Sequence, residues 1–331
     1  MYHHFYGLCE SPFALTPDPK YLFLSPSHKD ALASMIYGVN ERKGFVLILG
    51  EVGTGKTTLA RHILGQSGMN IKIAFIFTPV ASFEELLQMV LQDLEVPCQS
   101  QQRLAMINAL SDFLLQELVA ERYVVLIIDE AQYLCHDILE DLRMFSNVET
   151  AHSKLLQIIL IGQPELGKKL GHPDLRQLRQ RIGLVARLQP LTVQETRHYI
   201  AHRLKGAGHA GGELFTSRAQ ATIYRASQGI PRLINVICDK ALVLGYGADA
   251  KQITDRIVKE VVKDWSVFGP GIAPAPTRPR LRRAPMLLVL MAVVLILVFM
   301  REPSHDLLPR LWRMLVEKAS DIAAGRGLLH F

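Results

Sequence analysis

The chain has 331 residues, of which 49% are hydrophobic and 21% are charged, with 37 basic and 31 acidic side chains. This composition excludes an intrinsically disordered chain and leaves room for about two domains with a substantial core. No cysteine pair has Cys-x-x-Cys spacing, and His3-His4, the one adjacent histidine pair, is interpreted as a surface feature. The sequence therefore predicts neither a zinc site nor a thiol redox pair.

The net charge of +6 is concentrated at one end of the chain. Nine of the basic and four of the acidic residues lie from Ser266 onward, so residues 1–265 hold 28 basic and 27 acidic residues. A nearly neutral segment of this size argues against an extensive nucleic-acid-binding face. Nucleic acid is therefore not an expected partner.

The most informative motif is Gly-Glu-Val-Gly-Thr-Gly-Lys-Thr-Thr at 50–58, which follows an apolar run at 45–49 and precedes a helical pattern. Strand, glycine loop and helix in this order match the phosphate-binding loop of nucleoside triphosphatases. The glycines let backbone N–H groups face phosphate oxygens, and the helix N-terminus adds partial positive charge. Lys56 is expected to neutralise the β- and γ-phosphates of ATP, and the Thr57 hydroxyl to bind Mg²⁺. The predicted nucleotide-binding residues are Gly50, Glu51, Val52, Gly53, Thr54, Gly55, Lys56, Thr57 and Thr58.

Strand and helix patterns alternate from about residue 45 to 188, and only helical patterns follow as far as 265. Short apolar strands are expected at 45–49, 71–77, 123–128, 155–161 and 184–188, with helices at 57–64, 82–94, 103–121, 137–145 and 173–180. All-apolar strands between helices indicate a parallel sheet that is covered on both faces. The sequence predicts a lead-in at 1–43, which either packs on the core or contacts the nucleotide, an α/β nucleotide-binding core at 44–190, and a small all-α domain at 191–268.

The C-terminal part has a different composition. A Pro- and Arg-rich linker is expected at 269–283, and the uncharged apolar run 284–300 predicts a transmembrane helix whose flanking arginines extend its reach. A buried core helix is the alternative for this run. A short amphipathic tail is expected at 301–331, and no secretory signal peptide is indicated at the N-terminus.

Two carboxylates end the apolar strand at 124–128. Asp129 is expected to hold Mg²⁺ through water, and Glu130 to polarise the water that attacks the nucleotide. The alternative is an acidic pair that caps the following helix.

An α/β core with this loop and acidic pair, followed by a small helical domain, resembles the AAA+ ATPases with their helical lid. The resemblance implies that Gln163, at the end of the next strand, senses the γ-phosphate; turn chemistry before Pro164 is the alternative. It also implies that Arg232, after Gly229-Ile230-Pro231, reaches the γ-phosphate from the lid.

The resemblance further implies an arginine finger, which completes the site of a neighbouring subunit. Arg176, Arg179 and Arg181 lie where AAA+ ATPases place this residue, and Arg181 is favoured because it directly precedes the last strand. A solvated basic helix face is the alternative.

Several motifs together resemble the general secretion pathway protein A family, whose relatives include ATPases of type IV pilus biogenesis and of exosortase systems. The motifs are Tyr6-Gly7-Leu8, Pro12-Phe13, Pro17-Asp18-Pro19, Leu24-Ser25-Pro26-Ser27-His28, the loop 50–57, Asp129-Glu130-Ala131-Gln132, Gly162-Gln163-Pro164-Glu165-Leu166 and Gly229-Ile230-Pro231-Arg232-Leu233-Ile234-Asn235. The resemblance covers roughly residues 1–265 and implies an inner-membrane protein whose ATPase domain is cytoplasmic. Some members bind peptidoglycan through a periplasmic domain, which the short segment after Met300 does not accommodate, so peptidoglycan is not an expected partner.

The sequence thus predicts a single-pass inner-membrane AAA+ ATPase that uses ATP and Mg²⁺, forms a homo-oligomeric ring and acts with components of a cell-envelope secretion or export system. Three alternatives stay open: a regulator that acts on nucleic acid, as transposition ATPases do, a nucleotide-gated scaffold with little turnover, and an accessory ATPase of pilus or exopolysaccharide export.

Overall fold

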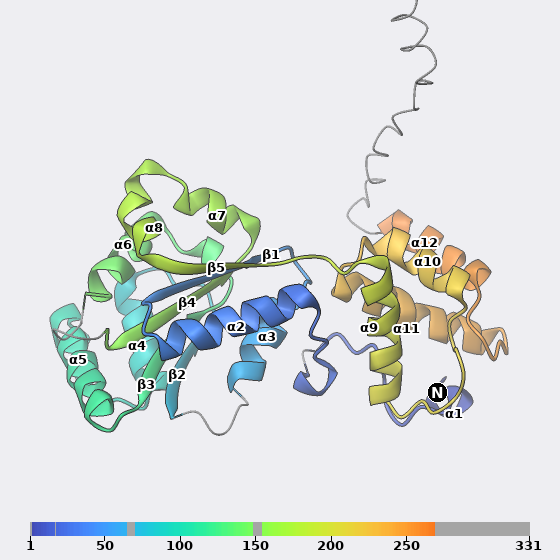
Figure 1. Cartoon of the computed structure of the whole chain (residues 1–331), viewed down its shortest axis with the longest axis horizontal. Coiled ribbons are helices and arrows are strands. Elements are labelled where there is room, and N and C mark those ends of the chain that lie inside the picture. The colour runs from blue at the N-terminus through green and yellow to red at the C-terminus, as the bar shows by residue number, and fades with distance from the viewer. Residues whose placement is uncertain (1, 17, 65–69, 148–153, 269–331) are drawn as a thin grey trace, which may run out of the picture. The chain divides into compact units, whose positions relative to one another are not determined.

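The computed structural model of the chain describes residues 2–16, 18–64, 70–147 and 154–268, which fall within one compact unit, Met1–Pro270 (Figure 1). The predicted linker at 269–283, transmembrane helix at 284–300 and tail at 301–331 lie outside the described residues. Among the described residues, no helix is both long enough and apolar enough to cross a membrane.

Five parallel strands form a single sheet in the order β2-β3-β4-β1-β5. Their bounds are β1 Phe45–Gly50, β2 Ile71–Ile76, β3 Tyr123–Ile128, β4 Leu156–Gly162 and β5 Ile182–Leu188. Every residue of β1 and β4 is buried, as their apolar sequences favour. Gln157, the polar exception in β4, accepts from the Gly44 N–H at 2.8 Å. The predicted parallel α/β core is confirmed.

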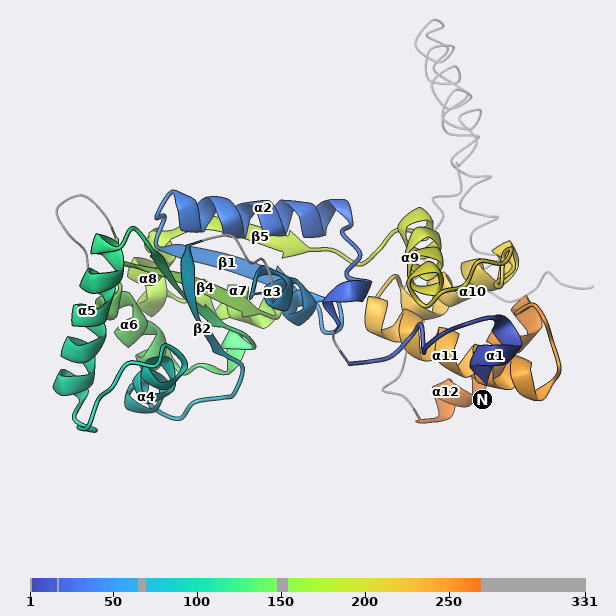
Figure 2. The same cartoon turned by 90° about the horizontal axis from the view of Figure 1, so that it is seen from below.

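Helices cover both faces of the sheet (Figures 1 and 2). Alternate strand residues point to opposite faces, so Val46 and Ile48 pack with one set of helices while Phe45 and Leu47 pack with the other. The first set is α2 Pro26–Asn40 and α3 Lys56–Leu64; the second is α4 Phe83–Asp93, α5 Arg103–Val119, α6 His136–Phe145, α7 Pro164–Leu170 and α8 Arg176–Arg181. Short 3-10 turns occur at η1 Pro19–Tyr21, η2 Ala131–Tyr133 and η3 Pro173–Leu175.

The segment between β4 and β5 is more helical than the sequence predicted. No element was predicted at 164–170, where α7 forms; Pro164 occupies the first turn of this helix, where its fixed φ favours helix formation. The helix expected at 173–180 divides into η3 and α8, and β5 begins at Ile182 rather than at Leu184.

The all-α domain predicted at 191–268 contains α9 Val193–Gly206, α10 Ser217–Ser227, α11 Pro231–Gly247 and α12 Asp255–Phe268. A capping box opens α9: the Thr192 side chain accepts from the Glu195 backbone N–H, and the Glu195 carboxylate accepts from the Thr192 N–H. Buried side chains such as Phe215 and Leu242 give this domain its own core. It is called the lid below.

The first part of the predicted lead-in packs on the lid. Tyr2 and Tyr6 of α1 (Tyr2–Tyr6), together with Phe13, belong to the lid core, and the Phe13 and Phe215 rings meet edge to face at 6.0 Å. The N–H of Cys9 also donates to a lid carbonyl, that of Ala207, at 2.8 Å. The predicted lead-in thus packs on two parts of the fold: its beginning packs on the lid, whereas α2 packs on the sheet.

Arg203 of α9 fastens this N-terminal segment to the lid. Its side chain is 7% exposed, and its guanidinium donates to the carbonyl oxygens of Pro12 (2.5 Å) and Ala14 (3.2 Å) and to the Tyr199 hydroxyl (3.1 Å). The same group lies 4.5 Å from the centre of the Tyr21 ring. Carbonyl dipoles and aromatic faces therefore stabilise a buried cation.

We expect Arg203→Ala to lower the free energy of unfolding by about 2–4 kcal/mol, because it leaves buried carbonyl groups without a donor. Denaturant unfolding of the purified chain measures this change. Arg197→Ala, at an exposed position of the same helix, is the matched control and should shift stability by less than about 0.5 kcal/mol. Equal stability of the two variants would show that Arg203 does not fasten the segment.

Candidate nucleotide-binding site

Three segments that follow neighbouring strands form the site. β1 leads into the loop 50–55, β3 into Asp129 and Glu130, and β4 into Gln163. Since β4 lies between β1 and β3 and all three are parallel, their carboxyl ends meet at one edge of the sheet. Sheet topology thus brings together groups that lie more than 100 residues apart in sequence.

The loop has the backbone that its glycines predict. Gly53 and Gly55 have φ values of +80° and +99°, a region that residues with a side chain rarely adopt. A Cβ atom on Gly53 would also lie 2.7 Å from Cβ of Arg232, which leaves no room for a side chain. α3 begins directly after the loop, at Lys56, so its first N–H groups face the loop interior.

Lys56 is a buried cation that bonds to the loop itself. Its side chain is 5% exposed, and its ammonium donates to the carbonyl oxygens of Gly50 (2.9 Å) and Glu51 (3.1 Å). Burial lowers the pKa of Lys56, while the nearby carboxylates of Glu130 and Asp129 act to raise it. Within the described part of the chain Lys56 forms no ion pair, so a phosphate group would supply the counter-charge that it lacks.

Thr57 and Asp129 lie together at the predicted magnesium position. The Thr57 hydroxyl donates to Asp129 Oδ2 at 2.5 Å, and Asp129 Oδ1 accepts from the Glu130 N–H at 2.8 Å. Hydroxyl and carboxylate oxygens are hard ligands of the kind that Mg²⁺ prefers, so these residues fit the ion. When bound there, Mg²⁺ would neutralise charge on the phosphates.

Glu130 is held by two glutamine amides. Its Oε2 accepts from Gln132 Nε2 at 2.6 Å and from Gln163 Nε2 at 3.2 Å, and Gln132 Oε1 accepts from the Gln163 N–H at 3.1 Å. Glu130 has φ +51°, a left-handed conformation that costs a non-glycine residue about 1–2 kcal/mol. The alternative was that the acidic pair caps the following helix. The Glu130 side chain does not do so, because it makes no capping hydrogen bond to η2.

His28 supports the loop from below, a role that the sequence did not predict. It is 3% exposed, with Nε2 2.9 Å from the Thr54 carbonyl oxygen and Nδ1 2.7 Å from Ser25 Oγ. A carbonyl only accepts, so Nε2 carries the proton, and in the neutral ring Nδ1 accepts from the Ser25 hydroxyl. Burial lowers the pKa of His28 and so favours this neutral form.

A pocket of about 370 Å³ opens above the loop and is shared between the core and the lid. Lys56, Thr57 and Glu130 line it from the core, and Arg232 lines it from the lid. Arg232 is exposed, and its backbone N–H donates to the Gly53 carbonyl at 3.2 Å. The pocket is also lined by Tyr21 of the N-terminal segment. The remaining predicted loop residues at this pocket are Val52, Gly53, Thr54, Gly55 and Thr58, whereas Gly50 and Glu51 line a second, neighbouring hollow.

The candidate finger arginines lie away from this pocket. Arg181 ends α8, and its guanidinium donates to Ser146 Oγ at 2.9 Å and to the Arg143 carbonyl oxygen at 3.4 Å. Arg176 and Arg179 are exposed, and Arg179 donates to the Gly171 carbonyl oxygen at 3.3 Å. An arginine finger acts in the nucleotide site of a neighbouring subunit, so it is expected to lie outside the site of its own subunit. The assignment of this role to Arg181 stays a prediction.

Comparisons with known proteins agree with this geometry. Residues 39–170 match the AAA domain family. The Cdc6p structure from Pyrobaculum aerophilum has a TM-score of 0.59 and 19% identity over 77% of this chain and 70% of that chain. The ORC2 structure from Aeropyrum pernix has a TM-score of 0.55 and 15% identity over 75% of this chain and 72% of that one. The two structures share the fold of this chain. The match to the AAA domain family identifies the chain as an AAA+ ATPase.

The sequence of general secretion pathway protein A from Aeromonas hydrophila is 43% identical over 254 residues. These residues are 76% of this chain and 46% of the relative, so the chain spans about half of that protein's length. The chain belongs to the general secretion pathway protein A family of AAA+ ATPases.

We expect Gln132→Leu to lower kcat for ATP hydrolysis about 10- to 100-fold while nucleotide affinity stays unchanged, because the variant releases Glu130 without touching the loop. Steady-state turnover and equilibrium binding of a fluorescent ATP analogue separate the two effects. Gln101→Leu, at an exposed position outside the site, is the matched control. An unchanged kcat, or a loss that lies wholly in affinity, would rule out a positioning role.

Proposed function

We propose that this chain binds and hydrolyses ATP and uses that energy to drive the assembly or operation of a cell-envelope secretion or export system. The observation that carries the proposal is the Glu130 carboxylate, held by Gln132 and Gln163 beside the Thr57–Asp129 pair and the buried Lys56. Similarity to general secretion pathway protein A supports secretion as the process that this chain serves.

In the proposed reaction, the loop N–H groups and Lys56 bind the phosphates of ATP, and Thr57 and Asp129 hold Mg²⁺. Glu130 orients and polarises the attacking water as general base. Both amides bond to Oε2, and within the described part of the chain Oε1 is left for the attacking water. Gln163 thereby acts through Glu130, in addition to any contact with the γ-phosphate.

The lid and the neighbouring subunit complete the proposed mechanism. Arg232 reaches the phosphates from the start of α11 and so couples the lid to the nucleotide state. Arg181, with Arg176 and Arg179 as competitors, contributes to the site of the next subunit in a homo-oligomeric ring. The apolar run 284–300 anchors the chain in the inner membrane with residues 1–268 on the cytoplasmic side, where ATP is available.

We expect Lys56→Ala to abolish nucleotide binding, because it removes the cation that faces the phosphates. Glu130→Gln should retain binding and lower kcat by about 10²- to 10⁴-fold, as loss of a general base does. Binding and turnover measured on the same preparations test both, with exposed Glu95→Gln as the matched carboxylate control. If Glu130→Gln hydrolyses ATP at the wild-type rate, the general-base assignment is wrong.

The cellular role is tested with Glu130→Gln as an ATP-bound trap. Crosslinking in the native membrane, followed by affinity purification, should recover envelope secretion or export components that Lys56→Ala does not retain. Recovery of nucleic acid with salt-dependent affinity would instead support the nucleic-acid regulator.

We expect a reporter fused after Phe331 to lie outside the cytoplasm and the same reporter fused after Arg278 to lie inside it, because the run 284–300 separates the two positions. A reporter that is active only in the cytoplasm measures this difference. Cytoplasmic activity of both fusions would contradict the single-span anchor.

A further inference from the structure

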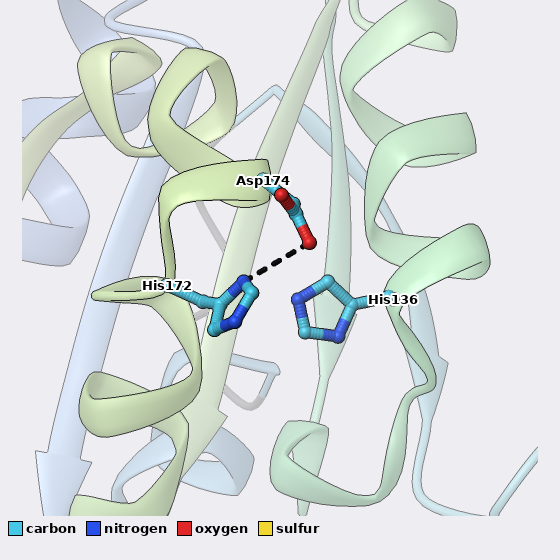
Figure 3. Close-up of side chains that lie close together, drawn as sticks. All are labelled: His136, His172 and Asp174. Atoms are coloured by element: carbon cyan, nitrogen blue, oxygen red, sulfur yellow. Dashed lines mark ion pairs between the residues drawn. The ribbon is translucent and has the colours of Figure 1, made fainter.

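A second cluster of ligand-type side chains lies outside the nucleotide site. His136, His172 and Asp174 each offer one ligand atom, and the three atoms lie within 4.8 Å of one another (Figure 3). His172 Nδ1 is 3.1 Å from Asp174 Oδ2. Among the described residues, no other group of three histidine, cysteine or acidic side chains meets this spacing.

His136 contributes a nitrogen that is buried and unsatisfied. Its Nε2 is shielded from solvent and has no hydrogen-bond partner. Figure 3 shows the His136 ring directed toward His172 and Asp174, and the two imidazole rings lie 5.3 Å apart at 82°. A buried polar atom without a partner costs about 1–3 kcal/mol, so the fold retains this arrangement at a cost.

We propose that His136, His172 and Asp174 bind a divalent transition-metal ion of the zinc class. Two imidazole nitrogens and one carboxylate oxygen suit Zn²⁺ or Co²⁺, whereas Mg²⁺ prefers oxygen ligands alone. Metal–ligand bonds of about 2.0–2.2 Å in a tetrahedral site place ligand atoms roughly 3.4 Å apart. The His172–Asp174 pair already has a separation of this size, and His136 Nε2 supplies the third ligand after a small shift.

The remaining coordination positions face solvent. The side chains of His172 and Asp174 are 54% and 73% exposed, so an ion can enter from the surface and retain water. The site thus has one shielded ligand atom, His136 Nε2 on a half-buried side chain, and an open side formed by the other two ligands.

The ion would join two segments that matter for the proposed ATPase mechanism. His136 begins α6, which follows Glu130 and η2, while His172 and Asp174 immediately precede α8 and its arginines. Lys169 already connects the same segments, since its ammonium donates to the carbonyl oxygens of Gln132 (2.6 Å) and Leu134 (2.7 Å). Metal binding would therefore fix α8 relative to the loop that carries the general base.

The test uses the full-length chain, purified in detergent without nucleotide and freed of metal with a chelator. Titration with Zn²⁺ by calorimetry should show a single ion per chain, and Co²⁺ should give the ligand-field absorption of a nitrogen and oxygen site. Excess Mg²⁺ should not displace either ion. Absence of stoichiometric Zn²⁺ binding would overturn the proposal and leave an ion pair between His172 and Asp174 only.

Three variants assign the ligands. His172→Ala and Asp174→Asn alter exposed side chains, and His136→Ala alters a half-buried one. Each should weaken Zn²⁺ binding at least about tenfold, since loss of an outer-shell partner alone has that effect. His198→Ala, an exposed histidine of α9, and Cys135→Ser should bind like the wild type. Loss of binding in Cys135→Ser with retention in His172→Ala would assign the ion to thiols and overturn the proposal.

Discussion

The pairing of β4 with both β1 and β3 is the constraint on which the nucleotide site depends. The register sets Leu49 opposite Gly162 and Ile128 opposite Leu160, so the three strands end at nearly the same level. The pairing of these strands therefore brings together the loop after β1, the acidic pair after β3 and Gln163 after β4, which are distant in sequence. Because side-chain direction alternates along a strand, a shift of one residue would exchange the side chains that face the two sets of helices, and close packing on both faces therefore fixes the register.

Two buried cations show how a structural side chain differs from one that is available for a ligand. Arg203 and Lys56 are similarly buried. Arg203 is surrounded by carbonyl oxygens, a hydroxyl and aromatic rings that belong to fixed parts of the lid and the N-terminal segment. Both side chains line the pocket, but Lys56 bonds to two carbonyls of the phosphate-binding loop itself. A phosphate that enters the pocket would supply the negative charge that these neutral carbonyl groups lack, which is the electrostatic basis of the site.

The parts of the protein that are encoded locally could be predicted from the sequence. Apolar strand runs, the glycine loop, the Asp129-Glu130 pair and the Thr192 capping box each depend on neighbours within a few residues. The contacts that could not be predicted join distant segments: His28 with Thr54, and His136 with His172. The position of Tyr2 in the lid core depends on partners more than 200 residues away, for which a single sequence carries no local signal.

The N-terminal segment adds contacts between the nucleotide pocket and the lid that the lid helices do not make by themselves. Arg203 holds Pro12 and Ala14, and a few residues later Tyr21 both packs under the same guanidinium and lines the pocket. The beginning of this segment shares the lid core, while η1, which carries Tyr21, packs on α3 of the core as well as on α9 of the lid. The loop, Arg232 of the lid and Tyr21 of the N-terminal segment thus all line the one pocket, so a bound nucleotide would contact all three parts of the fold.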